Sequence, residues 1–417
     1  MKRLFLILMA ALTLCHAGVA EQSSPYRSLA DLQSARQAAW EAYAERERQS
    51  QTRLEEMKAL KMSFGDAAMR FTVQKTGKAD ENGYACYIAL HGGGASDTPA
   101  INDKQWRHMQ IYYLYAVKNA VYVAPRGVRD TWDTHFNPES YPLYDRLIQN
   151  LILFENVDPN RVYLMGYSAG GDGVYAVAPR MADRFAAASM SAGHPNGVSM
   201  LNTFRLPFLL QTGIDDSAYD RNRVTAEYAV KLDELQAQYP AGFAHACFIH
   251  VGKGHGILDY AVERQKVLKN IGEWLDTGSI EAIEADTNAA RFLEQYRRDP
   301  LPESVMWDLS TRADRREVLS FYWLSAPAEV KEGVIEARYD KATNTVTVER
   351  CTVNGAYSIL LNEQMADLFR PLTIKTPEGE TVIDQLPLSP DTLAETTRER
   401  GDPNFQFFVR LTKGKDF

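Results

Sequence analysis

The chain has 417 residues, of which 45% are hydrophobic and 24% are charged, and its formal net charge is −8. This length exceeds what a single hydrophobic core usually supports, so we expect more than one domain. Nucleic acid is not expected as a partner, because the balance is acidic and phosphate binding needs a concentrated cationic surface.

The first residues have the pattern of an export signal. Two basic residues precede the apolar run Leu4–Leu14, which is too short to cross a bilayer as a mature helix. Small residues follow at 18–20, where a signal peptidase would cut. We therefore predict a signal peptide over residues 1–20, and a periplasmic or secreted protein without stable membrane insertion after cleavage.

Three cysteines remain after the predicted cleavage: Cys86, Cys247 and Cys351. An odd number leaves room for one disulfide, whose pairing the sequence does not specify. Cys86 and Cys247 lie in strand-like apolar runs, which suits buried free thiols equally well. No cysteine or histidine group has metal-ligand spacing, so no metal site is expected.

An N-terminal helical segment is predicted over residues 21–62, with one long charged helix from about Ser28 to Lys61. Residues 63–300 then alternate short apolar runs with longer amphipathic segments. The expected strands are Cys86–Leu90, Ala120–Ala124, Arg161–Met165, Ala186–Met190, Pro207–Gln211 and Ala246–Val251, and the expected helices include Tyr144–Phe154, Gly173–Arg184 and Asn222–Tyr239. This α/β alternation predicts a mostly parallel central sheet with helices on both faces.

The pattern changes in the last third of the chain. Residues 260–300 are charged and have a helical appearance, and residues 301–329 are interpreted as a proline-bearing linker. Short strand-like runs separated by turn-forming residues fill residues 330–417. We predict a small, mainly β C-terminal domain there.

The glycine-rich stretch GYSAGGDG, residues 166–173, allows two interpretations. Residues 171–176 formally match the dinucleotide fingerprint G-x-G-x-x-A. That match begins several residues after the strand that ends at Met165, and no convincing acidic partner follows it. The Gly-Lys-Ser/Thr ending of a P-loop is also missing. A phosphate-binding loop is therefore the weaker interpretation.

The stronger interpretation is a nucleophile turn, G-x-S-x-G, between a hydrophobic strand and an amphipathic helix. Such a turn is strained, and side chains two positions before and after Ser168 would clash, which accounts for Gly166 and Gly170. The helix that starts here would point its first amides at a developing oxyanion. We expect the Ala169 N–H to be one donor.

A second glycine motif, HGGG, follows the strand that ends at Leu90. Glycine lets the main chain approach a substrate carbonyl closely, so the amides of Gly92 and Gly93 are expected to complete an oxyanion hole with Ala169. His91 is better interpreted as an anchor of this loop, at the edge of the substrate pocket, than as a base.

The acid and the base of a triad should follow the serine, each after a later strand. Asp216 lies three residues after Gly213 and is the preferred acid, with Asp215 as the alternative. His255 stands between two glycines after the next strand and is the expected base. Trp132, Tyr167 and His194 complete the set of possible pocket residues.

With these motifs the chain resembles the α/β-hydrolase superfamily. Within that superfamily, its sequence is similar to secreted esterases of the polyhydroxybutyrate depolymerase and feruloyl esterase type. The resemblance covers about residues 70–275. It implies a Ser168–His255–Asp216 triad that cleaves carboxylic esters of small-molecule or polymeric substrates through an acyl-enzyme, without a cofactor. A serine peptidase of the prolyl-oligopeptidase type is the alternative, and a hydrolase-like polymer-binding protein is a third hypothesis.

Overall fold

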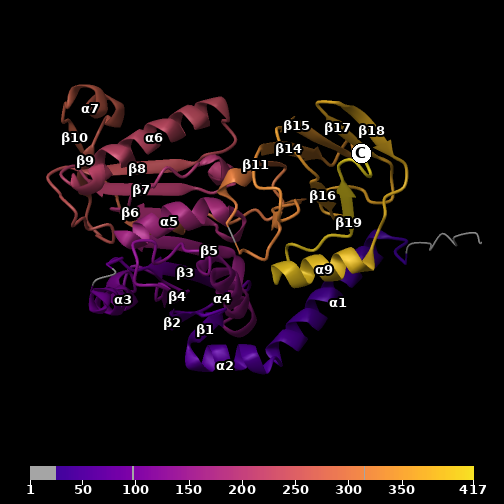
Figure 1. The fold of residues 1–417 in the computed structure, drawn as a ribbon, viewed down its shortest axis with the longest axis horizontal. Coiled ribbons are helices and arrows are strands. Elements are labelled where there is room, and N and C mark those ends of the chain that lie inside the picture. Colours follow the sequence, from indigo (N-terminus) through magenta and orange to yellow (C-terminus); the bar gives the residue numbers. More distant parts are fainter. Residues whose placement is uncertain (1–24, 96–97, 314) are drawn as a thin grey trace, which may run out of the picture.

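A computed structural model describes residues 25–95, 98–313 and 315–417. The predicted signal peptide, residues 1–20, lies outside the described residues and stays a prediction. The described chain forms a large α/β unit that continues into a β-rich C-terminal unit, and helix α1 runs alongside both (Figure 1). The predicted fold class, an α/β-hydrolase body with an added β-rich part, is confirmed.

The central sheet has ten strands in the order β1-β2-β4-β3-β5-β6-β7-β8-β9-β10. The six strands from β4 to β8 in this order are mutually parallel, and an antiparallel pair extends the sheet at each end. Their bounds are β1 Lys61–Phe64, β2 Ala67–Thr76, β3 Tyr84–Leu90, β4 Ala120–Pro125, β5 Val157–Tyr167, β6 Ala187–Ser191, β7 Phe208–Gly213, β8 His245–His250, β9 Gln265–Leu268 and β10 Ala282–Ala285.

Helices cover both faces of this sheet, as predicted. Along β3, Cys86, Ile88 and Leu90 belong to the core on the side of α4 and α5, whereas Tyr87 and Ala89 belong to the core on the side of α3 and α8. Because successive side chains of a strand point to opposite faces, a strand buried on both faces is apolar throughout. The helix bounds are α3 Pro99–Tyr112, α4 Ser140–Phe154, α5 Ala169–Arg180, α6 Arg221–Gln238, α7 Ile271–Thr277 and α8 Ala289–Leu293.

Two expectations for helical regions need correction. Residues 260–300 hold two short helices, but also β9 and β10, which lengthen the sheet. Three of the four β10 residues are exposed, so this edge strand lacks the alternation of buried and exposed residues that predicts a strand. The N-terminal segment forms two helices, α1 Leu29–Arg48 and α2 Gln51–Ala59, rather than one. The break lets the buried Arg53 of α2 bind Glu47 and Asn150.

In the part that the structure describes, the C-terminal unit contains two sheets and one α-helix. The five-stranded sheet has the order β11-β14-β15-β17-β18 and the four-stranded sheet the order β12-β13-β16-β19. The bounds are β11 Ser304–Asp308, β12 Ser320–Phe321, β13 Leu324–Ser325, β14 Val334–Asp340, β15 Thr345–Cys351, β16 Ser358–Leu361, β17 Leu372–Thr376, β18 Gly379–Ile383, α9 Pro390–Arg400 and β19 Val409–Thr412. The prediction of a linker over residues 301–329 was wrong, because these residues supply β11, β12 and β13 to the two sheets.

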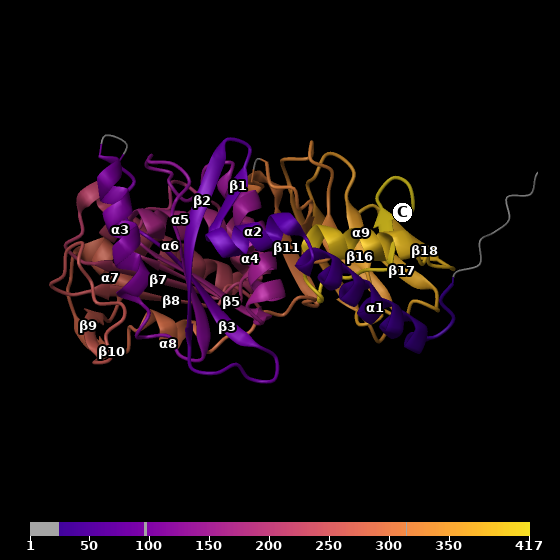
Figure 2. The same ribbon diagram turned by 90° about the horizontal axis from the view of Figure 1, so that it is seen from below.

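The two units share one buried apolar core, which includes Leu147 and Val174 of the α/β unit and Trp307, Trp323 and Phe408 of the C-terminal unit. Figure 2 shows the resulting side-by-side arrangement, with α1 lying along the C-terminal unit. The units are therefore joined by a continuous interior rather than by a flexible connection.

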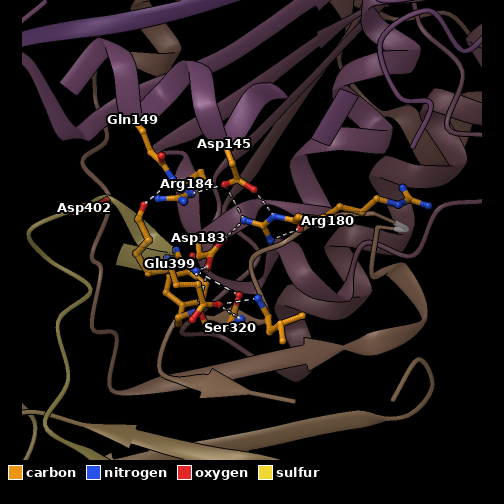
Figure 3. Close-up of polar contacts among 12 residues, drawn as sticks. Asp145, Gln149, Arg180, Asp183, Arg184, Ser320, Glu399 and Asp402 are labelled. Carbon is orange, nitrogen blue, oxygen red and sulfur yellow. Dashed lines mark hydrogen bonds and ion pairs between the residues drawn. The ribbon is translucent and has the colours of Figure 1, made fainter. Parts of the chain in front are cut away.

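Buried ion pairs cross the same boundary (Figure 3). Asp145 of α4 binds Arg184 at 2.7 Å and Arg316 of the C-terminal unit at 2.8 Å. Asp183 binds Arg400 of α9 at 2.6 Å, and both side chains are at most 1% exposed. Burial lowers the pKa of Arg400 to about 10, and the Asp183 carboxylate opposes this shift and favours the charged guanidinium.

Cys86, Cys247 and Cys351 are all free thiols. Within the described part of the chain, no helix combines the length and the apolar character needed to span a membrane.

Candidate active site

Ser168 occupies a sharp turn between the end of β5 and the start of α5. Its backbone has φ 59° and ψ −124°, a conformation that a residue with a side chain adopts only under strain. An added Cβ at Gly166 would lie 2.3 Å from the carbonyl oxygen of Gly170, and one at Gly170 would lie 2.1 Å from that of Leu90. Only glycine fits at these two positions, so the two glycines allow the strained turn to form at the carboxyl ends of the parallel strands.

Ser168, His255 and Asp216 form one chain of hydrogen bonds. His255 Nε2 lies 3.0 Å from Ser168 Oγ, and His255 Nδ1 lies 2.8 Å from Asp216 Oδ2. An ionised carboxylate only accepts, so Nδ1 carries the proton and Nε2 is left to accept from the serine hydroxyl. This is the geometry of a nucleophile, a base and an orienting acid.

Asp216, rather than Asp215, is the acid that contacts His255. The Asp216 side chain is 2% exposed, whereas that of His255 is 45% exposed and reaches the surface of the site. The Asp215 N–H donates to the Lys253 carbonyl, which ties the two loops that carry the acid and the base. An added Cβ on Gly213 would lie 2.1 Å from the Gly254 carbonyl, so glycine allows this close approach.

The loop after β3 carries the HGGG motif, residues 91–94, and is here called the glycine loop. It passes directly beside Ser168. An added Cβ on Gly92 would lie 3.3 Å from Ser168 Cβ. Gly93 and Gly94 have φ values of 114° and 85°, which glycine adopts without strain. The side chain of Asn102 on α3 fixes this loop, because its Oδ1 accepts from the Gly94 N–H at 2.7 Å and its Nδ2 donates to the Ala95 carbonyl at 3.0 Å.

His91 does not line the substrate site, contrary to the prediction, because it is fully buried beneath the glycine loop. Its Nε2 accepts from the Gly127 N–H at 3.0 Å, so Nδ1 holds the proton that is shared with the Gly92 carbonyl at 2.6 Å. Burial lowers the pKa of His91 to about 4 and keeps the ring neutral. The residue acts as a loop anchor.

Two cavities meet at Ser168 and Gly93. The first, here called the His255 cavity, has a volume of about 400 Å³ and an aromatic and apolar lining that includes Tyr112, Tyr167 and Tyr260. The second, here called the Trp132 cavity, has a volume of about 450 Å³. Its lining includes Trp132, Asp172, His194, Tyr219 and Arg221.

The predicted pocket residues therefore lie on different sides of the nucleophile. Trp132 is 61% exposed at the rim of its cavity. The backbone of His194 donates to Asp172 Oδ1 at 2.7 Å, and its ring contacts Asn196. The Tyr167 hydroxyl donates to the His255 carbonyl at 2.5 Å and accepts from the Ile257 N–H at 2.8 Å. Tyr167 thus also holds the loop that carries the base.

Asp259 was not predicted from the sequence. It is a buried carboxylate beneath the loop that carries His255, here called the His255 loop. It is fully buried and accepts hydrogen bonds from Ser191 Oγ at 2.5 Å, from Tyr113 at 2.6 Å and from Tyr112 at 3.1 Å. Burial raises its pKa to about 6, and the three hydroxyl donors oppose this shift. Asp259 thus connects the His255 loop to α3 and to the end of β6. In the sequence, its position four residues after the predicted base was the feature that pointed to it.

Two further charged residues border the nucleophile. Asp172, one helical turn after Ser168, has its pKa raised by burial and lines the Trp132 cavity. Arg221 Nη1 lies 3.2 Å from the second oxygen of Asp216 and its guanidinium stacks over Tyr219.

No cluster of three or more histidine, cysteine, aspartate or glutamate side chains suited to a metal ion occurs among residues 25–95, 98–313 and 315–417. The groups gathered around Ser168 are a hydroxyl, an imidazole, a carboxylate and backbone amides. Such groups perform acyl transfer by nucleophilic attack and proton relay.

The topology and the strand–turn–helix at Ser168 define an α/β-hydrolase fold. Solved structures that are similar to part of the chain include a thermostable esterase (18% identity, TM-score 0.38, covering 57% of this chain and 63% of that one) and LpqC, a poly(3-hydroxybutyrate) depolymerase from Bordetella parapertussis (16%, 0.37, 55% and 88%). Another is a CE1 ferulic acid esterase from the anaerobic fungus Anaeromyces mucronatus (17%, 0.29, 47% and 83%). The matched part of this chain spans less than two thirds of the first of these proteins. No family model and no curated protein matches the chain.

Proposed function

We propose that this protein is a serine hydrolase that cleaves carboxylic ester bonds. The observation that carries the proposal is the hydrogen-bond chain from Ser168 through His255 to Asp216, with lengths of 3.0 and 2.8 Å, at a strained turn beside two cavities. A hydroxyl held in this way is activated by the imidazole and is exposed to a bound carbonyl.

In the first half of the reaction, Ser168 Oγ attacks the carbonyl carbon while His255 Nε2 takes the serine proton. The negative charge that develops on the carbonyl oxygen is bound by the Ala169 amide and by the amide of Gly92 or Gly93, and one such donor typically contributes about 3 kcal/mol. Asp216 holds the imidazole in the required tautomer and stabilises its charged form. The imidazolium then protonates the leaving oxygen as the ester C–O bond breaks, and the acyl group stays on Ser168.

In the second half, a water molecule attacks the acyl carbon and gives one proton to His255. The bond from the acyl carbon to Ser168 Oγ breaks, the serine recovers its proton from the imidazolium, and a carboxylic acid leaves. These steps use only side chains and backbone amides of the chain. We further propose that the protein acts after export to the periplasm or the exterior, on the strength of residues 1–20.

A substrate panel tests this function. The mature protein should hydrolyse short aryl esters, and Ser168→Ala should lower kcat by at least about 10³-fold. Aminoacyl and prolyl amides belong in the same panel, since a serine peptidase uses the same three side chains. Amide turnover far above ester turnover would replace the esterase proposal by the peptidase alternative, and binding without turnover of either class would support a polymer-binding protein.

A further inference from the structure

A third cavity, here called the Arg180 cavity, continues the site beyond the nucleophile. Its volume is about 350 Å³. It shares Trp132 and Asn196 with the Trp132 cavity, which in turn shares Ser168 and Gly93 with the His255 cavity. The three cavities therefore follow one another along the surface, with Ser168 at one junction and Trp132 at the next.

The far end of this groove includes residues of the C-terminal unit. Ser310 and Thr311, which follow β11, line the Arg180 cavity. Asn202 of the α/β unit binds the residues on either side of Ser310, because its Nδ2 donates to Thr311 Oγ1 at 2.5 Å and its Oδ1 accepts from the Asp308 N–H at 2.6 Å. The groove is thus preformed by two parts of the chain that are joined rigidly.

Arg180, at the end of α5, supplies a positive charge to this cavity. Its Nη1 donates to the Ala176 carbonyl at 2.8 Å. Figure 3 shows its guanidinium pointing away from Asp145 and Asp183, the carboxylates that pair with the neighbouring arginines. Among the residues that the structure describes, no carboxylate forms an ion pair with Arg180. A guanidinium facing a cavity with several free donors is suited to a carboxylate.

Helix geometry sets the distance between this charge and the nucleophile. Arg180 lies twelve residues after Ser168 on the helix that the serine precedes, which corresponds to roughly 18 Å at 1.5 Å per residue. The hydrogen bond to Ala176 folds the side chain back by about one turn. The guanidinium is therefore roughly 12 to 18 Å from Ser168.

The direction of the substrate follows from the proton relay. His255 Nε2 must protonate the leaving oxygen, so the leaving group occupies the cavity that His255 lines. The acyl chain then extends the other way, past the exposed ring of Trp132. Stacking or edge contact on this ring would cover apolar surface that now faces water.

We propose that the preferred substrate is an ester whose acyl chain is long and ends in a carboxylate, and that Arg180, with the hydroxyl-lined end of the groove, binds this carboxylate. The proposal rests on the esterase function proposed above. It gives the C-terminal unit a role in substrate selection, because Ser310 and Thr311 form part of the subsite.

The test compares two long esters and one short ester. The long pair is the mono-para-nitrophenyl ester of dodecanedioic acid and the same molecule with its far carboxyl capped as a methyl ester. The short substrate is para-nitrophenyl acetate, which does not reach the Arg180 cavity. The full mature chain is assayed as wild type, Arg180→Gln, Arg180→Lys and Trp132→Ala. Arg223→Gln is the matched control, because it removes an exposed arginine of α6.

We expect wild type to prefer the free carboxylate over the capped ester by roughly tenfold or more in kcat/KM, and this preference to fall with salt. Arg180→Gln should abolish the preference without changing acetate turnover, Arg180→Lys should keep part of it, and Trp132→Ala should weaken both long esters. Equal rates on the capped and uncapped esters, or equal effects of Arg180→Gln and Arg223→Gln, would overturn the inference alone. Failure to hydrolyse all three esters, together with no reaction of Ser168 with a fluorophosphonate, would instead overturn the proposed function.

Discussion

Gly170 follows the nucleophile by two residues, and a side chain there would collide with the carbonyl of Leu90 at the end of β3. The strained backbone of Ser168 persists only because Gly166 and Gly170 leave room for it. Side chains are therefore sterically excluded at these two positions, and this requirement is visible in the sequence as glycine on each side of the serine. For this reason the turn was predictable, as were the three residues that form the hydrogen-bond chain, which come in the order that the fold imposes.

Gly170→Ala should lower the free energy of unfolding by several kcal/mol, because its Cβ would lie 2.1 Å from a backbone oxygen that has no room to move. Gly256→Ala, beside His255, is the control, since nothing lies within 4 Å of the added Cβ. We expect that variant to stay within about 0.5 kcal/mol of wild type. Denaturant unfolding measures both changes, and equal stability of the two variants would contradict the strained-turn account.

Asp259 makes stability depend on pH. Its pKa rises from the ordinary 3.8 to about 6 on folding, so between these values the native state binds the proton more tightly than the unfolded chain. This contribution to the free energy of unfolding is largest below about pH 4. It falls by about 3 kcal/mol as pH rises through 6. Asp259→Asn removes the contribution, so the difference in stability between wild type and variant should decline across that interval. A constant difference from pH 4 to pH 7 would show that Asp259 does not titrate as described.

At the scale of elements, the loops around Ser168 are held by side chains from helices that the sequence motifs do not include. Asn102 of α3 binds the glycine loop, and Tyr112, the last residue of α3, and the following Tyr113 bind Asp259. Local sequence gives no sign of these contacts, because they depend on how α3 packs on the sheet. The same limit explains the misplacement of His91, whose burial follows from the fold of the loop over it.

Asn102→Ala should lower kcat by about tenfold to a hundredfold with little change in KM, because the glycine loop would lose the contacts that fix its amides. Lys104→Ala, an exposed neighbour on α3, is the control and should leave kcat unchanged. Steady-state hydrolysis of an aryl ester measures both. Equal kcat values for the two variants would show that Asn102 does not support the oxyanion site.

Other elements were partly readable from sequence. Helix α9 was missed, although Ser389 followed by Pro390 is a helix-start signal and the Ser389 side chain accepts from the Thr392 N–H. The residues taken as a linker form strands, because β12 and β13 have only two residues each and such short runs show no period-2 alternation. The register and order of the strands depend on long-range pairing, which no local pattern contains.

At the scale of the whole molecule, the shared core and the buried ion pairs make the two units one structure. Asp183 is fully buried and binds Arg400 of α9 at 2.6 Å, while its second oxygen faces Arg316 at 3.8 Å. The amino-acid composition of the chain does not indicate these ion pairs or the shared core. Its consequence is that the C-terminal unit cannot move independently of the groove to which it contributes Ser310 and Thr311.

Asp183→Asn should lower the free energy of unfolding by about 3 to 5 kcal/mol, because it leaves the buried Arg400 without a countercharge. Both units should still unfold in one transition, since one apolar core spans them. Asp276→Asn, at an exposed position of α7, should change stability by less than about 0.5 kcal/mol. Two separate thermal transitions in wild type would contradict the shared-core account.

The central claim is that Ser168 is a nucleophile activated by His255, and covalent labelling tests it most directly. A fluorophosphonate should form one stable adduct, which peptide mass spectrometry should locate on Ser168. The adduct should be absent in Ser168→Ala and should form at least about 10³-fold more slowly in His255→Ala. An unlabelled wild-type protein, or equal labelling of wild type and Ser168→Ala, would contradict the account.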